Sequence, residues 1–159
     1  MGELARTDAR HTDLFFRKVL VTGLSERKRQ LLQAQFKAEE LFRAIESGNL
    51  IAPLKSEKVL NDEVYELAFT LFGIRKYWHK RIVRAGKNTL LPYKENPPDL
   101  IIQPDDILFF DFGPVFEDWE ADFGRTYVLG NDPEKIQLKK ILNRPGMRGR
   151  NIVTDIFRR

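Results

Sequence analysis

The stretch FFDFGPVFEDWEADFGRT, residues 109–126, has the pattern of a hairpin that carries acids among aromatic side chains. Residues 107–113 are rich in strand-forming side chains, and residues 119–129 return as a second strand. Between them, residues 114–118 hold a proline and two acids that suit a turn. An acid inside such an apolar strand is costly unless it is paired or coordinated. The hairpin therefore determines how the sheet forms, and its acids are the first candidates for a functional site.

Asp111 and Asp122 are the two acids that this hairpin brings to one face. If the turn centres on residues 116 and 117, paired positions sum to 233, and 111 + 122 = 233. The two carboxylates would then be directly opposed, with Cβ atoms about 4.5–5.5 Å apart, where like charges are destabilising. The pattern predicts two neighbouring carboxylates that need a compensating group.

Three kinds of group could compensate these carboxylates: a shared proton, an arginine or lysine, or a divalent cation. Arg125 is a poor candidate, because it follows Asp122 by three residues and so lies on the opposite face of a strand. Judged by spacing alone, two aspartates in a hairpin are about as often turn-capping or solvent-facing as metal-ligating. The spacing leaves these alternatives open.

Two amphipathic helices precede the hairpin. Residues 26–47 and 57–72 repeat apolar side chains every three or four positions, so each predicts a helix with one face on the core. Ser25 suits the first helix as an N-cap, and Gly48 and Gly73 suit the two carboxyl ends.

The remaining segments connect these elements. Residues 77–85 read as extended, residues 86–89 (GKNT) as a turn, and the proline-rich residues 90–100 as a loop. After the hairpin, residues 131–134 (NDPE) predict the start of a helix that runs to about residue 142. Helices followed by antiparallel strands indicate an α+β fold, with helices packed on a mainly antiparallel sheet.

Composition narrows the classes of function. The 159 residues suit one domain, and no stretch approaches the about 20 apolar residues of a membrane span. The start of the chain lacks the apolar run of a signal peptide, so we expect a soluble, cytoplasmic protein without a membrane partner. The chain has no cysteine, so any metal ligands must be aspartate, glutamate, histidine or backbone oxygen.

Positive charge gathers at the carboxyl end. Residues 131–159 hold eight Lys/Arg and three Asp/Glu, a net of 8 − 3 = +5, whereas the other residues sum to (27 − 8) − (23 − 3) = −1. A balanced body argues against a nucleic-acid-binding fold. The basic tail leaves one weaker alternative, an anchor for nucleic acid or an acidic surface.

The stretch DDILFFDFGPVFEDWEADFGRTYVLG, residues 105–130, resembles the metal-binding segment of the pita-bread metallopeptidases. This group contains methionine aminopeptidases, Xaa-Pro aminopeptidases and dipeptidases, and creatinase, and the likeness is greatest to the Xaa-Pro branch. The resemblance is carried by Asp111-Phe112-Gly113, Trp119 and Asp122-Phe123-Gly124-Arg125-Thr126. It implies that Asp111 chelates one metal and Asp122 bridges two divalent ions (Mn, Co or Zn). Such paired ions activate a water that attacks the scissile peptide bond of a peptide substrate.

The resemblance continues upstream, with one departure. Residues 81–96 resemble the family segment that leads to a substrate-contacting histidine just before a Tyr-x-x-Asn run. Here Tyr93 begins that run, and Pro92 occupies the matching place. His79 is the alternative imidazole, and we predict it as a substrate-binding residue.

The resemblance covers about residues 26–140, the amino-terminal half of such an enzyme. The family takes a further histidine and two glutamates from its second half, and no histidine follows His79 here. We therefore expect an arm over residues 1–24, a partial pita-bread domain over 25–142, and a disordered or unrelated basic tail over 143–159.

An incomplete domain of this kind has two possible functions. The first is a truncated Xaa-Pro-type metallopeptidase relative with little or no activity, in which two aspartates give at most a weak metal site. The second is a non-catalytic binding module built on the pita-bread scaffold. Either version would expose apolar surface that the missing half covers, so we also expect self-association.

Overall fold

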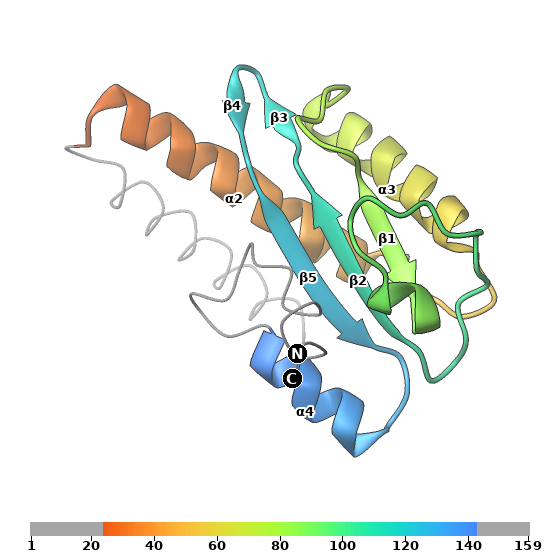
Figure 1. Ribbon diagram of the computed structural model, residues 1–159. Helices are drawn as coiled ribbons and strands as arrows, with labels where there is room; N and C mark the ends of the chain where they lie inside the picture. The colour runs from red at the N-terminus through yellow and green to blue at the C-terminus, as the bar shows by residue number, and fades with distance from the viewer. Residues whose placement is uncertain (1–23, 143–159) are drawn as a thin grey trace, which may run out of the picture.

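The computed structural model describes residues 24–142. Helices α2 (Glu26–Ser47) and α3 (Glu57–Phe72) come first, followed by strands and then by helix α4 (Pro133–Leu142). Figure 1 shows α2 and α3 side by side behind the sheet, and α4 beside β5. The α+β class with helices on an antiparallel sheet is confirmed. Of the predicted arm only Leu24 is described, and the tail over 143–159 lies outside the described residues.

The two long helices begin and end where their sequences predict. The Ser56 hydroxyl caps α3 by accepting a hydrogen bond from the Val59 N–H at 3.2 Å, and Gly73 ends this helix in the left-handed conformation with φ 67°. Ser25 occupies the N-cap of α2 without a side-chain cap bond. No helix among the described residues is long and apolar enough to cross a membrane.

A three-stranded antiparallel sheet has the order β1 (Ile82–Ala85), β2 (Ile107–Phe112) and β5 (Phe123–Val128). The stretch read as extended over 77–85 thus contributes a shorter strand, preceded by an isolated bridge between Tyr77 and Pro114. The GKNT segment forms a short 3₁₀ helix, η1 (Gly86–Leu90), in place of a simple turn.

The hairpin register differs from the prediction by two residues. Asp111 pairs with Gly124, so paired positions sum to 111 + 124 = 235. The reason is a small second sheet, in which β3 (Val115–Phe116) pairs with β4 (Trp119–Glu120) and confines the turn to Glu117 and Asp118. The return strand is broken between β4 and β5. Because the shift is an even number of residues, every side chain keeps its predicted face.

The core lies between the helices and one face of the sheet. Alternate residues of β2 are buried there, and Phe42 of α2 packs its ring against three phenylalanines of the hairpin, with centroid distances of 6.0, 6.0 and 5.2 Å to Phe110, Phe112 and Phe123. Such aromatic packing buries a large apolar area. The intervening side chains of β2, including Asp111, lie on the other face.

Glu57 joins α3 to the first strand. Its buried carboxylate accepts hydrogen bonds from the Ala85 N–H at 2.6 Å and from Asn88 Nδ2 at 2.9 Å. Burial raises the pKa of Glu57, and the two hydrogen bonds partly oppose that rise. This carboxylate fixes the end of β1 and the start of η1 against the helix layer.

Candidate metal centre

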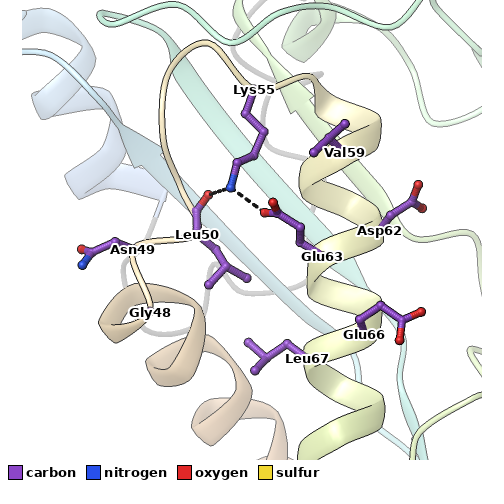
Figure 2. Close-up of a pocket in the computed structure, with 9 residues that line it drawn as sticks. All are labelled: Gly48, Asn49, Leu50, Lys55, Val59, Asp62, Glu63, Glu66 and Leu67. Atoms are coloured by element: carbon purple, nitrogen blue, oxygen red, sulfur yellow. Dashed lines mark hydrogen bonds and ion pairs between the residues drawn. The ribbon is translucent and has the colours of Figure 1, made fainter.

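One hollow of the surface lies between the end of α2 and the side of α3, on the helix layer (Figure 2). It measures about 680 Å³, and Lys55 crosses it to donate to the Leu50 carbonyl at 2.8 Å and to the Glu63 carboxylate. Its other acids, Asp62 and Glu66, are exposed helix side chains. Since Lys55 already neutralises Glu63 and no histidine lines the hollow, it offers no set of free metal donors.

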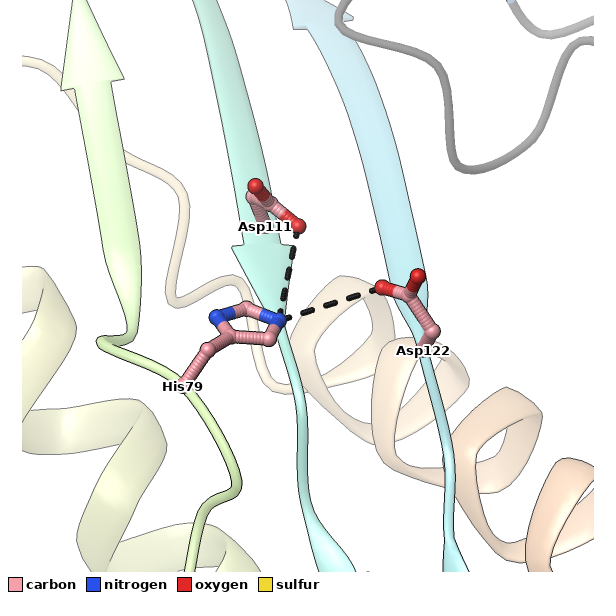
Figure 3. Close-up of side chains that lie close together, drawn as sticks. All are labelled: His79, Asp111 and Asp122. Atoms are coloured by element: carbon pink, nitrogen blue, oxygen red, sulfur yellow. Dashed lines mark ion pairs between the residues drawn. The ribbon is translucent and has the colours of Figure 1, made fainter. Parts of the chain in front are cut away.

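A different group of side chains meets on the sheet side, as Figure 3 shows. Asp111 comes from β2, Asp122 from the break between β4 and β5, and His79 from the segment before β1. Asp122 precedes Gly124, the partner of Asp111, by two residues. The two aspartates are therefore diagonal neighbours on one face, where the predicted register had them directly opposed.

The three side chains point their polar atoms at a common space. His79 Nε2 lies 3.8 Å from Asp111 Oδ1 and 3.8 Å from Asp122 Oδ1. One ligand atom from each residue falls within 4.8 Å of the other two, and within residues 24–142 no other group of three His, Asp or Glu side chains meets this criterion. The side chains are 11%, 25% and 51% exposed for His79, Asp111 and Asp122, so the space opens towards Asp122.

The imidazole of His79 is fixed on its far side. Its Nδ1 lies 2.8 Å from the Lys80 carbonyl oxygen, and since a carbonyl only accepts, Nδ1 carries the proton. Trp78 packs edge-on against the ring with centroids 4.3 Å apart, and Tyr93 lies on another side at 6.2 Å. Gly113 leaves room for both rings, because a Cβ there would lie 2.5 Å from His79 Cδ2 and 2.5 Å from Trp78 Nε1.

Burial dominates the electrostatics of Asp111. Desolvation raises the pKa of this carboxyl, His79 lowers it, Asp122 raises it and Arg84 lowers it, in that order of size. Arg125 plays no part here: its guanidinium lies over the Phe42 ring on the helix side and pairs with Glu46 at 3.3 Å. The prediction that Arg125 faces away from the aspartates is confirmed.

Arg84 is the cation that sequence reasoning missed. It is buried in β1 and donates to the carbonyls of Leu91, Pro92 at 3.0 Å and Glu95 at 2.9 Å, and burial lowers its pKa. The sequence pattern that could have identified Arg84 is a charged residue between Val83 and Ala85 in an otherwise apolar strand, because a buried cation needs hydrogen-bond partners. The Pro92 carbonyl thus serves as a backbone acceptor for Arg84.

The loop that Arg84 holds forms one wall of the site. Lys80 binds the same loop through the Tyr93 carbonyl at 3.2 Å and the Asn96 side chain at 2.9 Å, and the Tyr93 hydroxyl accepts the Lys80 N–H at 3.2 Å. The two basic residues thereby keep Tyr93 beside His79. The centre is bounded by this loop, by Trp78 and by the hairpin.

The chemistry of the donors fits a divalent ion. Carboxylate oxygens suit hard cations, and an imidazole nitrogen suits Zn, Co, Fe and related ions. The helix-backed antiparallel sheet of residues 24–142 matches part of the pita-bread fold. The model of metallopeptidase family M24 matches residues 29–146, and the chain belongs to that family.

Relatives of known type also match a large part of the chain. The Xaa-Pro dipeptidase of Lactobacillus delbrueckii subsp. lactis is 27% identical over 105 residues, which are 66% of this chain and 27% of that protein. Prolidase from Thermococcus sibiricus has a TM-score of 0.57 at 25% identity, and the match covers 67% of this chain and 28% of the prolidase chain. X-Pro aminopeptidase from Thermotoga maritima MSB8 has a TM-score of 0.61 at 19% identity. The match covers 79% of this chain and 35% of the aminopeptidase chain. The chain spans about a quarter to a third of these relatives.

Proposed function

We propose that this chain supplies the amino-terminal wall of an Xaa-Pro-type metallopeptidase site, with Asp111 and Asp122 as metal ligands. The observation that carries the proposal is the convergence of both carboxylates with an imidazole nitrogen at 3.8 Å from each. Family membership and the Xaa-Pro relatives support the reaction class, hydrolysis of an amino-terminal peptide bond.

Two divalent ions, when bound, supply polarisation of the scissile carbonyl and activation of a water. The residues of this chain would hold the ions and orient a bound peptide. Asp111, anchored within β2, would present a fixed oxygen to an ion, whereas the more exposed Asp122 would have more freedom to turn towards one. Tyr93 and Trp78 pack against the His79 ring and would restrict the approach of water and of a peptide from that side.

Peptide hydrolysis also needs groups that the described residues do not bring to this centre. The donor group of residues 24–142 contains no further carboxylate to act as a general base. We therefore expect the isolated chain to hydrolyse Xaa-Pro peptides weakly or not at all. An assay with an Xaa-Pro dipeptide and Co²⁺ or Mn²⁺ measures this, and turnover at the rate of a complete family enzyme would contradict it.

A metal titration tests the ligand assignment separately from catalysis. Calorimetry with Mn²⁺, Co²⁺ and Zn²⁺ should give binding that Asp111→Asn and Asp122→Asn each weaken by at least about tenfold, since losing even an outer-shell partner costs that much. Asp118→Asn is the matched control, because Asp118 is an exposed acid in the turn of the same hairpin. Binding indifferent to both site changes would remove the metal site.

The second candidate is a non-catalytic binding module. Pro92 favours it, because the backbone of that residue binds Arg84 and no imidazole is available at its position for a substrate. The metal titration distinguishes the two candidate functions, because a binding module has no need of the aspartates as metal ligands. Self-association through apolar surface stays a prediction for both, and sizing chromatography measures it.

A further inference from the structure

We propose that His79 ligates, through Nε2, the same divalent cation that Asp111 and Asp122 hold, so that residues 24–142 contain a three-ligand site of their own. This rests on the proposed function, because it presumes that the two aspartates bind metal. It changes the role of His79 from a residue that contacts only the peptide to one that selects the ion.

The space between His79 Nε2 and the two carboxylates is too wide for a direct hydrogen bond. Nε2 is 3.8 Å from each carboxylate oxygen, beyond the about 3.2 Å limit of an N–H···O bond. A peptide-binding imidazole would be expected to bond to one acid or to point past both. His79 Nε2 is equidistant from the two, which is the arrangement of donors around a common point.

The spacing also matches the size of an ion. Metal–nitrogen and metal–oxygen bonds are about 2.1 Å, so neighbouring ligands of a tetrahedral ion lie roughly 3.4 Å apart. The separations of 3.8 Å exceed this by only a few tenths of an ångström. The 51% exposed Asp122 side chain has the freedom to close that difference by a small rotation.

The other ring nitrogen supports the assignment. Because the Lys80 carbonyl fixes the proton on Nδ1, the lone pair of neutral His79 lies on Nε2 and faces the carboxylates. A metal-ligating histidine characteristically donates its second N–H to a carbonyl or carboxylate, which sets its tautomer and its orientation. Trp78 and Gly113 then hold the ring in place.

A nitrogen ligand makes a prediction about which ions bind. Two carboxylates alone serve Mg²⁺ or Ca²⁺ as well as transition ions, whereas imidazole favours Zn²⁺ and Co²⁺. Changing His79→Gln keeps a side chain of similar reach with an oxygen donor. We expect this variant to lose at least about tenfold in Zn²⁺ and Co²⁺ affinity while its weak Mg²⁺ affinity changes little.

The test uses the full chain with three probes: Zn²⁺ and Mg²⁺ in calorimetry, and Cu²⁺ in pulsed electron paramagnetic resonance. We expect imidazole nitrogen signals from bound Cu²⁺ that His79→Gln abolishes and that His11→Gln, which removes the other histidine of the chain, leaves intact. Signals that persist in His79→Gln, or unchanged Zn²⁺ affinity in that variant, would overturn the inference.

Two further readouts keep the test decisive. If His79→Gln does not fold, imidazole ¹⁵N chemical shifts of the unaltered chain during a Zn²⁺ titration report the same bond, and an unmoved Nε2 resonance refutes it. Loss of binding in Asp111→Asn with full retention in His79→Gln overturns this inference and leaves the proposed function standing. Full retention in both aspartate variants overturns the two together.

Discussion

Replacing Gly113 with alanine tests whether the backbone of the hairpin positions His79. A Cβ at this residue would lie 2.5 Å from His79 Cδ2, and 2.5 and 2.7 Å from Trp78 Nε1 and Cδ1. Non-bonded carbon atoms rest about 3.5–4.0 Å apart, so the two rings must retreat by about 1 Å. The rings pack on each other, which prevents either from moving alone.

The movement also reaches Asp122. Trp78 Nε1 donates to the Ala121 carbonyl at 3.0 Å, and this bond fixes the residue next to Asp122. We expect Gly113→Ala to cost about 1–3 kcal/mol of unfolding free energy through overpacking. Because a displacement of about 1 Å is half the length of a metal–ligand bond, Co²⁺ affinity should fall by at least about tenfold.

Urea unfolding and Co²⁺ calorimetry on the same preparations measure the two effects. Gly124→Ala is the matched control in the facing strand, because its Cβ would meet only the Phe110 carbonyl oxygen within 4 Å, at 3.3 Å. We expect that control to bind Co²⁺ like the unaltered chain. A folded Gly113→Ala protein with undiminished Co²⁺ affinity would refute the reasoning that Gly113 positions the imidazole.

Three other changes test the core, the loop and a buried acid. Phe42→Ala should cost about 3–5 kcal/mol of unfolding free energy, against about 0.5 or less for the exposed Leu31→Ala on the same helix. Arg84→Lys removes the fork that binds three carbonyls, so it should cost about 1–3 kcal/mol and speed amide exchange over residues 91–96. For Glu57, the stability of the unaltered chain relative to Glu57→Gln should fall as pH rises above about 4.5.

The sign of the Glu57 effect follows from burial. Its folded pKa is raised above the ordinary 4.5, so its contribution to stability is complete below pH 4.5 and is lost as pH rises through the folded value. A difference that is flat or that grows with pH contradicts this. Equal costs for Phe42→Ala and Leu31→Ala would contradict the core assignment, and unchanged exchange in the loop would contradict the role of Arg84.

The helices and the faces of the hairpin could be predicted because both follow from local periodicity. Residues 26–47 and 57–72 form α2 and α3 with the predicted bounds. The turn was less determined, since the residues between the strands lack an Asn-Gly or Asp-Gly pair to mark it. Glu117, which adopts φ 58°, is not a residue that favours that conformation, so the register could not be read from sequence.

The placement of His79 depends on contacts distant in sequence. The Trp78 N–H donates to the Gly113 carbonyl at 2.9 Å, and the Tyr77–Pro114 bridge lies beside it. These pairings extend the β1–β2 edge beyond the regular strand and carry the next residue, His79, to the aspartates. No spacing rule links residue 79 to residue 111, and so sequence alone could offer this histidine only as a candidate.

The corrected register changes the physical account of the two aspartates. Directly opposed residues would have Cβ atoms about 4.5–5.5 Å apart, whereas diagonal neighbours are about 7–8 Å apart, so their mutual repulsion is weaker. Consistent with this, burial raises the pKa of Asp111 more than Asp122 does. The wider spacing also leaves a gap that His79 can enter. The register shift of two residues thus separates the Asp111 and Asp122 carboxylates enough to leave room for an imidazole and an ion between them.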